Sequence, residues 1–461
     1  MKTIKTPIIP IEQTFINVKD QPHELDYKAI CVFSALGFFL GTDTYWKDKK
    51  VLSPASINKI DADGFLVSSE PWFDWYYKPK NSSLENVTNE FSDLFEKIVS
   101  EQCIDKKVIL PISGGLDSRS QAVALHKLGI EVNAYSYSFE NGFYEAGISK
   151  KITQNCNFIF QEFTIKKNYL WDKIEELAAI NSCYSEFTHP RQMAVIDDIE
   201  KLGDVFSLGH WGDVLFDSEN LQRNYSDIEL LPLIKKKIIK KGGLELGISL
   251  WKNWELEGDF ENYLDNRILS LLSAINIVNS NAKIRAFKSM YWAPRWTSIN
   301  LSVFARNKEI HLPYYDDRMC QFICEVPESI LSNRQIQIEY IKQNNHALAK
   351  IVWQDAKPFN LYNHHLAKTH LVLPYRIIDK LKRKFESLIG KKFVQRNWEL
   401  QFIGQQNEKK LKKHLQCNEM IHQIDFDLIK EYLDLFYKKD QVYYSHSLST
   451  LLTLSLFFKN I

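Results

Sequence analysis

The sequence predicts an α/β fold, in which a parallel sheet with flanking helices follows a small β-rich segment and precedes a helical C-terminal region. Apolar, strand-like runs alternate with helix-periodic runs from Lys107 to about residue 208, which is typical of parallel sheets with crossover helices. Residues 1–80 are rich in aromatic and β-branched residues, and such residues favour strands. Beyond about residue 220, helical patterns dominate to the end.

Residues 1–80 are expected to form a small β-rich domain. Glycine and proline recur through this segment at Gly37, Gly41, Pro54, Gly64 and Pro71. This pattern predicts short strands and turns rather than helices. The polar stretch 78–83 predicts a linker, and apolar residues at helical spacing from 84 to 99 predict a helix after it.

The alternating region that follows divides into four strands and four helices. The predicted strands are 108–112, 131–137, 157–164 and 205–208, and the predicted helices are 118–128, 144–155, 169–180 and 191–201. We expect residues 84–360 to form one domain around this sheet. Residues 361–461 are expected to be helical, with the apolar stretch from Leu451 to Phe458 as a buried terminal helix.

Composition argues against several classes of function. The 461 residues carry 58 Lys and Arg against 57 Asp and Glu, a formal net charge of +1, so no global field favours nucleic acid or an anionic membrane. The seven cysteines lack the spacing of zinc sites or disulfide frameworks, which predicts reduced thiols in a cytoplasm. No segment has the ~20 apolar residues of a membrane span, and residues 1–20 lack the apolar core of a signal peptide.

A loop rich in serine and glycine joins the first strand of the predicted sheet to its helix. It consists of Ile112, Ser113, Gly114, Gly115, Leu116, Asp117 and Ser118. Glycines let the backbone approach an oxyanion, successive N–H groups form a concave nest, and the helix N-terminus presents positive charge to phosphates. Asp117 is placed to hold a magnesium ion that bridges phosphate oxygens. The alternative is a Gly-Gly turn with an aspartate cap.

Two further segments accompany this loop. Residues 113–118 resemble the SGGLDS signature of the PP-loop ATP pyrophosphatases, which cut ATP between its α and β phosphates. Residues 206–216 resemble the SGEGxDELF signature of the asparagine synthase family, in which Gly209, Asp213, Leu215 and Phe216 match in register. Residues 309–316 keep the Glu, Pro and Asp of that family's ExRxPFLD segment. The resemblance covers roughly residues 105–360.

The resemblance implies a PP-loop, adenine nucleotide alpha hydrolase-like fold that binds ATP and Mg²⁺. It implies nucleotide contacts from residues 112–118 and from Phe139, Leu208 and Gly209, with Asp117 and Asp213 as the magnesium-binding carboxylates. Glu145 matches an acidic position that follows the adenine-lining strand 135–139. On physical grounds as well, side chains at the carboxyl ends of parallel strands face a common crevice where ligands bind.

Three departures from the family pattern bear on function. Glutamine-hydrolysing members expose a cysteine as their first residue, whereas position 2 is Lys2 and no cysteine precedes Cys31. Residues 1–80 are therefore expected to be a remnant of a glutaminase-like domain without glutaminase activity. His210 replaces the first glutamate of SGEGxDELF and Val214 the second. An imidazole there either accepts a proton from an attacking amine or is a neutral hydrogen-bonding group.

The third departure concerns a lysine that, in the family, stabilises charge at the reacting carboxyl. Its position falls on or near Gln337. Arg334 and Lys342 are the neighbouring cations that could replace it, although each is also typical of a solvated helix residue.

These observations predict an ATP-dependent ligase that forms an amide through an acyl-adenylate and releases AMP and pyrophosphate, with His210 and Arg334 as candidate catalytic residues. Its substrates would be a small-molecule carboxylate and ammonia or an amine, with a separate glutaminase or biosynthetic partner as one source of nitrogen. The lost glutamates and lysine favour the alternative, a nucleotide-binding scaffold or regulator. A tRNA-modifying chemistry fits less well, because the sequence lacks catalytic cysteine pairs and a strongly basic balance.

A basic amphipathic helix is predicted near the C-terminal region. Basic residues from Arg376 to Lys384, and Lys391 and Lys392 beyond them, are interleaved with apolar residues. A solvated helix face and a partner or membrane surface both fit this pattern. The histidines at 364, 365 and 370 lack a spaced carboxylate or cysteine and predict a surface loop rather than a metal site.

Overall fold

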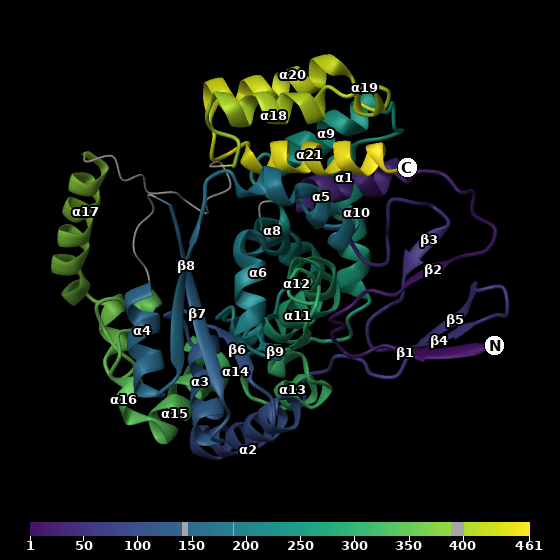
Figure 1. Cartoon of the computed structure of the whole chain (residues 1–461). Helices are drawn as coiled ribbons and strands as arrows, with labels where there is room; N and C mark the ends of the chain where they lie inside the picture. Colours follow the sequence, from purple (N-terminus) through teal and green to yellow (C-terminus); the bar gives the residue numbers. More distant parts are fainter. Residues whose placement is uncertain (141–145, 188, 389–400) are drawn as a thin grey trace.

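The predicted α/β architecture is confirmed in a computed structural model, which describes residues 1–140, 146–187, 189–388 and 401–461 (Figure 1). Its centre is a five-stranded sheet in the order β10-β9-β6-β7-β8. The strands are β6 (Val108–Pro111), β7 (Val132–Phe139), β8 (Ile159–Ile165), β9 (Val205–Ser207) and β10 (Glu309–His311). All four neighbouring pairs are parallel, so the carboxyl ends of all five strands open on one edge of the sheet.

The helix predicted before this sheet is present, as are three of the four helices predicted after its first strand. They are α2 (Leu84–Cys103), α3 (Asp117–Lys127), α4 (Ala146–Asn155) and α5 (Tyr169–Asn181). Helix α2 begins where expected because the Ser83 side chain accepts a hydrogen bond from the Asn86 N–H, which satisfies one free donor of the first turn. Most of its apolar residues at helical spacing are buried in the main core, where α2 packs chiefly against α15 (Gln335–Asn344) and α3.

The single helix predicted for residues 191–201 is wrong. The chain instead forms a 3₁₀ turn η1 (Arg191–Val195), one turn of α-helix α6 (Ile196–Ile199) and a second 3₁₀ turn η2 (Glu200–Leu202). Arg306 binds Glu176, Asp197 and Glu200 around this segment. These long-range ion pairs hold the short turns in place, and periodicity along the sequence does not reveal them.

The N-terminal segment contains short strands, as expected, which form two small sheets, and one helix that was not expected. Strands β1 (Lys2–Lys5), β4 (Ser56–Ile60) and β5 (Leu66–Pro71) form an antiparallel sheet, and β2 (Phe15–Asn17) pairs with β3 (Lys49–Val51). The prediction that this segment lacks helices is wrong, because α1 (Tyr27–Leu36) lies between β2 and β3 in the chain. Asp26 caps its start and Gly37, in the left-handed region at φ 77°, ends it.

The remaining helices lie after β9, as the sequence predicts, within residues 212–388 and 401–459. They are α7 (Gly212–Leu215), α8 (Asp227–Ile238), α9 (Gly243–Asn253), α10 (Phe260–Ser273), α11 (Ser280–Phe287), the π-helical η3 (Lys288–Thr297) and α12 (Ser298–Leu301). After β10 come α13 (Asp317–Ile323), α14 (Glu328–Leu331), α15 (Gln335–Asn344), α16 (His346–Ala349), α17 (Leu373–Leu388), α18 (Gln405–Leu415), α19 (Asn418–Ile421), α20 (Phe426–Asp434) and α21 (Ser445–Lys459). Among the described residues, none of these helices has both the length and the hydrophobicity needed to cross a membrane.

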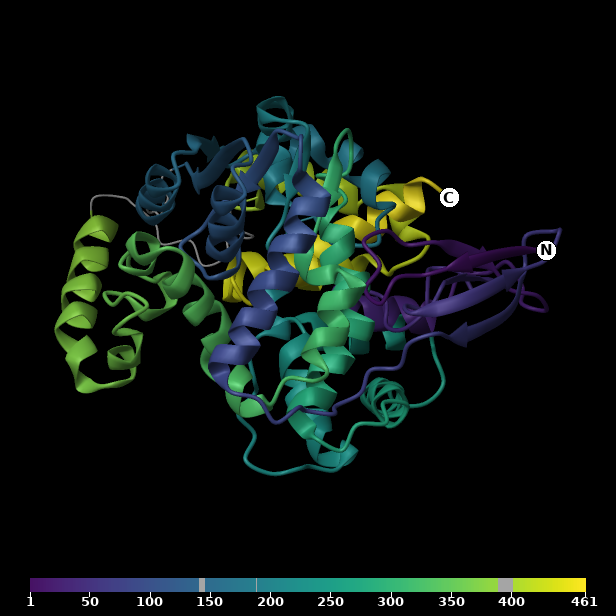
Figure 2. The ribbon, with the colours of Figure 1, turned by 90° about the horizontal axis from the view of Figure 1, so that it is seen from below.

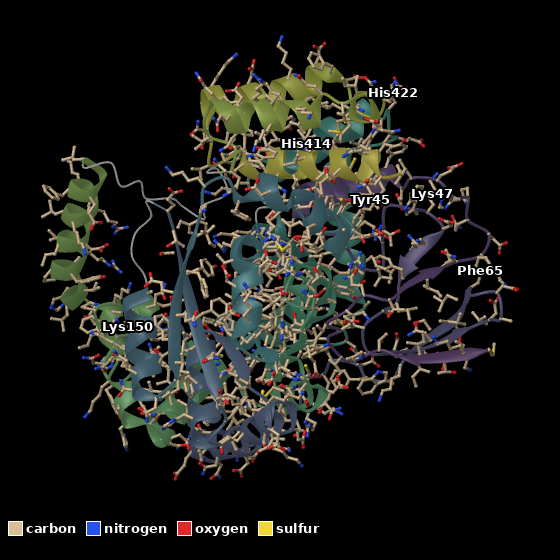
Figure 3. All side chains as sticks on the ribbon, in the orientation of Figure 1. Tyr45, Lys47, Phe65, Lys150, His414 and His422 are labelled. Atoms are coloured by element: carbon tan, nitrogen blue, oxygen red, sulfur yellow. The ribbon has the colours of Figure 1, made fainter. Side chains whose placement is uncertain are left out.

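Helix α21 is the buried terminal helix that the sequence predicts, since every residue from Ser445 to Phe458 is buried. It packs against the N-terminal part of the chain, where the His446 Nε2–H lies 3.0 Å from the Ser34 carbonyl of α1. The ring of Tyr45 stacks on Phe457 at a centroid distance of 3.6 Å, and Figure 3 shows Tyr45 beside α21. The two ends of the chain therefore share one hydrophobic core.

Candidate functional site

The serine- and glycine-rich loop lies between β6 and α3 and is curled by its own hydroxyl groups. The Ser113 N–H donates to Ser118 Oγ at 3.1 Å, and the Gly115 N–H donates to Ser113 Oγ at 3.2 Å. The N–H group between these two, that of Gly114, donates to Gln354 Oε1 at 3.1 Å. Successive N–H donors therefore line a tight turn at the start of an 11-residue helix, an arrangement that suits phosphate oxygens.

Gly114 allows a second segment to approach this loop. A Cβ at Gly114 would lie 2.8 Å from Gln354 Oε1 and 2.9 Å from Gln354 Cβ, so any other residue would push Gln354 away. The Gln354 N–H also donates back to the Gly114 carbonyl at 3.1 Å. The loop is thus paired, backbone and side chain, with a segment 240 positions later in the chain.

Arg119 fixes that pairing from inside the protein. Its guanidinium group, on a fully buried side chain, donates to the carbonyls of Gly114 at 3.2 Å, Val352 at 2.9 Å, Ile351 at 3.1 Å and Leu348 at 3.4 Å. A planar fork of donors can satisfy several carbonyls at once. Arg119 therefore joins the loop to the 348–352 segment, and sequence reasoning missed this role.

Asp117, the first residue of α3, lies at the centre of a polar network. Its Oδ1 accepts hydrogen bonds from Arg334 Nη2 and from Gln337 Nε2, the latter at 2.9 Å. Gln337 Nε2 also lies 2.9 Å from the hydroxyl of Tyr314. Burial raises the pKa of Asp117 to about 6, with Arg334 opposing that shift and Asp213 adding to it. The carboxyl is therefore poised close to neutral pH, where a cation would hold it ionised.

The segment between β9 and α7 brings Asp213 to the same place. A Cβ at Gly209 would lie 3.1 Å from the Ser118 nitrogen, and one at Gly212 would overlap Asp117 Oδ1 and lie 2.8 Å from Asp117 Cγ. Both glycines are thus required for the segment to lie directly on the first turn of α3. Asp213 follows at the exposed side of this contact, so the two carboxylates are neighbours.

His210 and Trp211 lie between Gly209 and Gly212 on the same segment. Trp211 adopts a left-handed backbone at φ 79°, and its indole N–H donates to Ser289 Oγ of η3 at 3.1 Å. His210 is open to solvent, but the surrounding protein partly withdraws it from bulk water and lowers the pKa of its imidazole to about 4, against the opposing effect of Asp213. A neutral imidazole at pH 7 can accept a proton and carries no positive charge.

The other predicted residues divide into those near the loop and those away from it. Ile112 and Leu116 of the loop are buried, as is Leu208, and Phe139 is the last residue of β7, at the carboxyl edge of the sheet. Lys342 instead pairs with Glu339 at 2.8 Å, so Arg334 is the candidate cation that contacts Asp117. Glu145, Lys391 and Lys392 lie outside the described residues.

The residues of the site fit a magnesium ion only as part of MgATP. Across the described ranges, no three His, Cys, Asp or Glu side chains gather closely enough to form a metal cage. Mg²⁺ commonly uses one or two carboxylates together with substrate phosphates and water. Asp117 and Asp213, beside a loop of N–H donors, supply that kind of partial ligand set.

Comparison with known proteins adds little to this geometry. No protein-family model matches the chain, and no curated protein matches it either. Among solved structures, the chain is similar to the NMN synthetase from Francisella tularensis, with 14% sequence identity over 45% of this chain and 93% of that one, at a TM-score of 0.23. Membership of the asparagine synthase family therefore stays a prediction that rests on the motifs.

Proposed function

We propose that this protein is an ATP-dependent ligase, similar to the asparagine synthases, that activates a carboxylate as its adenylate and passes the acyl group to a nitrogen nucleophile. One observation carries the proposal: Asp117 and Asp213 meet beside a loop of N–H donors at the N-terminus of α3. Paired carboxylates next to a phosphate-binding turn are what cleavage of ATP to AMP and pyrophosphate requires.

Each step of the proposed reaction is assigned to particular residues of the chain. The N–H groups of residues 113–118 bind and orient the phosphates, while Asp117 and Asp213 would hold the magnesium ion of MgATP. That ion supplies charge neutralisation on the departing pyrophosphate. Arg334 is held by a 2.9 Å hydrogen bond from its Nε to Gln337 Oε1. It provides the positive charge that the family's lysine would supply, because Gln337, at the position of that lysine, is neutral. Neutral His210 accepts the proton that the amine loses during attack.

The nitrogen source is proposed to be free ammonia, an amine, or ammonia from a separate glutaminase. Cys31, the first cysteine, is fully buried in α1, and burial raises the pKa of its thiol well above the usual range. A buried, protonated thiol is a poor nucleophile. This supports a reaction in which residues 1–80 do not hydrolyse glutamine.

A second candidate is a nucleotide-binding regulator without ligase chemistry. Arg334 and Gln337 both occupy Asp117 Oδ1, and Gln354 occupies the Gly114 N–H. These contacts compete with magnesium and with a phosphate oxygen. A protein that binds ATP weakly and never turns it over would show the same contacts.

The test measures AMP formation from MgATP labelled at the α-phosphate. Each mixture combines a pool of small carboxylic acids with ammonium or with pooled amines. Asp117→Asn and Asp213→Asn should each abolish AMP release, and calorimetry should show loss of the magnesium-dependent part of ATP affinity. Asp63→Asn, which removes an exposed carboxylate from a turn of the N-terminal sheet, is the matched control. Nucleotide binding without AMP in any mixture would exclude the ligase and favour the regulator.

A further inference from the structure

Helix α17 (Leu373–Leu388) stands at the edge of the molecule with its apolar side chains in solvent. Figures 1 and 2 both show it apart from the central sheet and from the C-terminal helices. Ile377 is 59% exposed, Leu381 62%, Phe385 67% and Leu388 78%. A soluble helix ordinarily buries such residues against a core, so the exposed face of α17 is unexplained by the fold.

The apolar residues of α17 form one continuous stripe. Leu373, Ile377, Leu381, Phe385 and Leu388 follow one another at intervals of four, four, four and three residues, which places them on one side of a 3.6-residue helix. Ile378 widens the stripe at one border. The stripe runs the length of the helix.

Charge is distributed around this stripe in a definite order. The helix carries five basic residues (Arg376, Lys380, Lys382, Arg383 and Lys384) against two acidic ones (Asp379 and Glu386). At 3.6 residues per turn, Arg376, Lys380 and Lys384 follow one border of the stripe and Lys382 the other. Asp379 and Glu386 lie on the opposite side of the helix. Positive charge therefore flanks the apolar face, and negative charge is turned away from it.

We propose that α17 binds an anionic lipid surface, lying in the plane of the headgroups with its apolar stripe among the acyl chains. An amphipathic helix that carries lysines beside its apolar residues, and whose polar face is strongly charged, has the properties of such an anchor. Lysine stems can cover apolar surface while their ammonium groups reach lipid phosphates. A second copy of α17 fits less well, because two such faces would bring basic borders together.

The experiment is co-sedimentation of the full chain with vesicles of neutral phosphatidylcholine, and with vesicles containing about 30% phosphatidylserine. We expect binding only to the anionic vesicles, and weaker binding at high salt because surface charges are screened. Leu381→Gln/Phe385→Gln removes part of the apolar stripe and should abolish binding. Lys380→Gln/Lys384→Gln removes two border charges and should lower the partition coefficient by about thirtyfold.

The matched control is Lys409→Gln/Lys413→Gln, which removes two exposed lysines, four positions apart, from α18. It should bind like the unaltered chain. The proposal would be overturned if the chain bound neutral and anionic vesicles equally or bound neither. It would also be overturned if the control lost as much binding as Lys380→Gln/Lys384→Gln. A lower unfolding temperature, or a lower molecular mass in solution than that of the unaltered chain, in Leu381→Gln/Phe385→Gln would likewise overturn it, because these would show that protein covers the stripe.

Discussion

The side-chain oxygen of Gln354 accepts a hydrogen bond from the Gly114 N–H at 3.1 Å, so a neutral amide occupies one donor of the serine- and glycine-rich loop. Gln354→Ala should free that donor and keep the backbone pairing of the two segments. We expect the affinity for MgATP to rise by up to about tenfold, the value of one hydrogen bond. Gln354→Glu should weaken binding, because a carboxylate there repels phosphate. Calorimetric titration of both variants checks this, and equal affinities would show that the loop binds no phosphate at Gly114.

Gly212 controls the position of the Asp117 carboxylate. A Cβ at this position would overlap Asp117 Oδ1 and come within 2.9 Å of Tyr314 Cζ. Gly212→Ala should therefore displace Asp117 while the helices remain intact, and lower AMP formation by about a hundredfold. Rates of AMP release and far-UV circular dichroism together test the prediction. Unchanged turnover in a folded variant would mean that Asp117 takes no part in the reaction.

Arg119 should contribute to both stability and nucleotide binding. A lysine at position 119 keeps the charge, but its single ammonium group cannot reach the four carbonyls that the guanidinium binds. We expect Arg119→Lys to lower the free energy of unfolding by on the order of 3 kcal/mol and to weaken MgATP binding. Urea unfolding measures the first effect and calorimetry the second. If Arg119→Lys unfolds like the unaltered chain, a point charge suffices and the fork geometry is unimportant.

The buried His446 should make the protein sensitive to acid. Burial lowers the pKa of His446 to about 4; Glu186 opposes this shift, and Lys240 and His189 add to it. The folded state therefore keeps the imidazole neutral, whereas the unfolded chain takes up a proton near pH ~6.5. The free energy of unfolding should fall as pH drops from about 6.5 towards 4, by on the order of 3 kcal/mol in total for this residue.

His446→Gln isolates that contribution, because the amide can still donate to the Ser34 carbonyl that His446 Nε2–H reaches at 3.0 Å. Urea unfolding at pH 7 and pH 5 should show a smaller loss of stability in this variant. His422→Gln removes an exposed histidine and serves as the control. A pH dependence equal in all three proteins would place the acid sensitivity elsewhere.

The sequence predicts most of the central sheet, and it names some of the residues that the structure brings together at the candidate site, for a physical reason in each case. Strands β6 to β9 are short runs rich in β-branched, aromatic and other apolar residues between helix-periodic segments, so local pattern suffices. Strand β10 has three residues, with the polar Glu309 and His311 at its ends. It pairs with β9, and the local sequence contains no pattern that predicts this pairing. Helix α1 is apolar nearly all round, and short apolar runs do not distinguish a buried helix from a strand.

Within the site, the residues that share a loop or motif are predictable and the residues that reach it through folding are not. Asp117 and Asp213 each follow a predicted strand, which is sufficient to expect them at one crevice. Gln337 contacts Asp117 from 220 positions away, and Gln354 contacts Gly114 from 240. Glutamine has no charge or periodicity to mark it. Only the packing of α15 and the 351–361 segment shows where these side chains lie.

The contact between α1 and α21 also determines when this protein can fold. Ser34 and His446 are 412 positions apart, yet they belong to the same core. While the ribosome is still synthesising the chain, α1 can already pack against α9, its main neighbour, but the part of α1 that contacts α21 still faces water. Domains generally fold in order from the N-terminus as they emerge, but here α1 is fully covered only after α21 has been synthesised. The native core therefore closes only after residues 445–459 have left the ribosome, and a chain truncated before them would remain a substrate for chaperones and proteases.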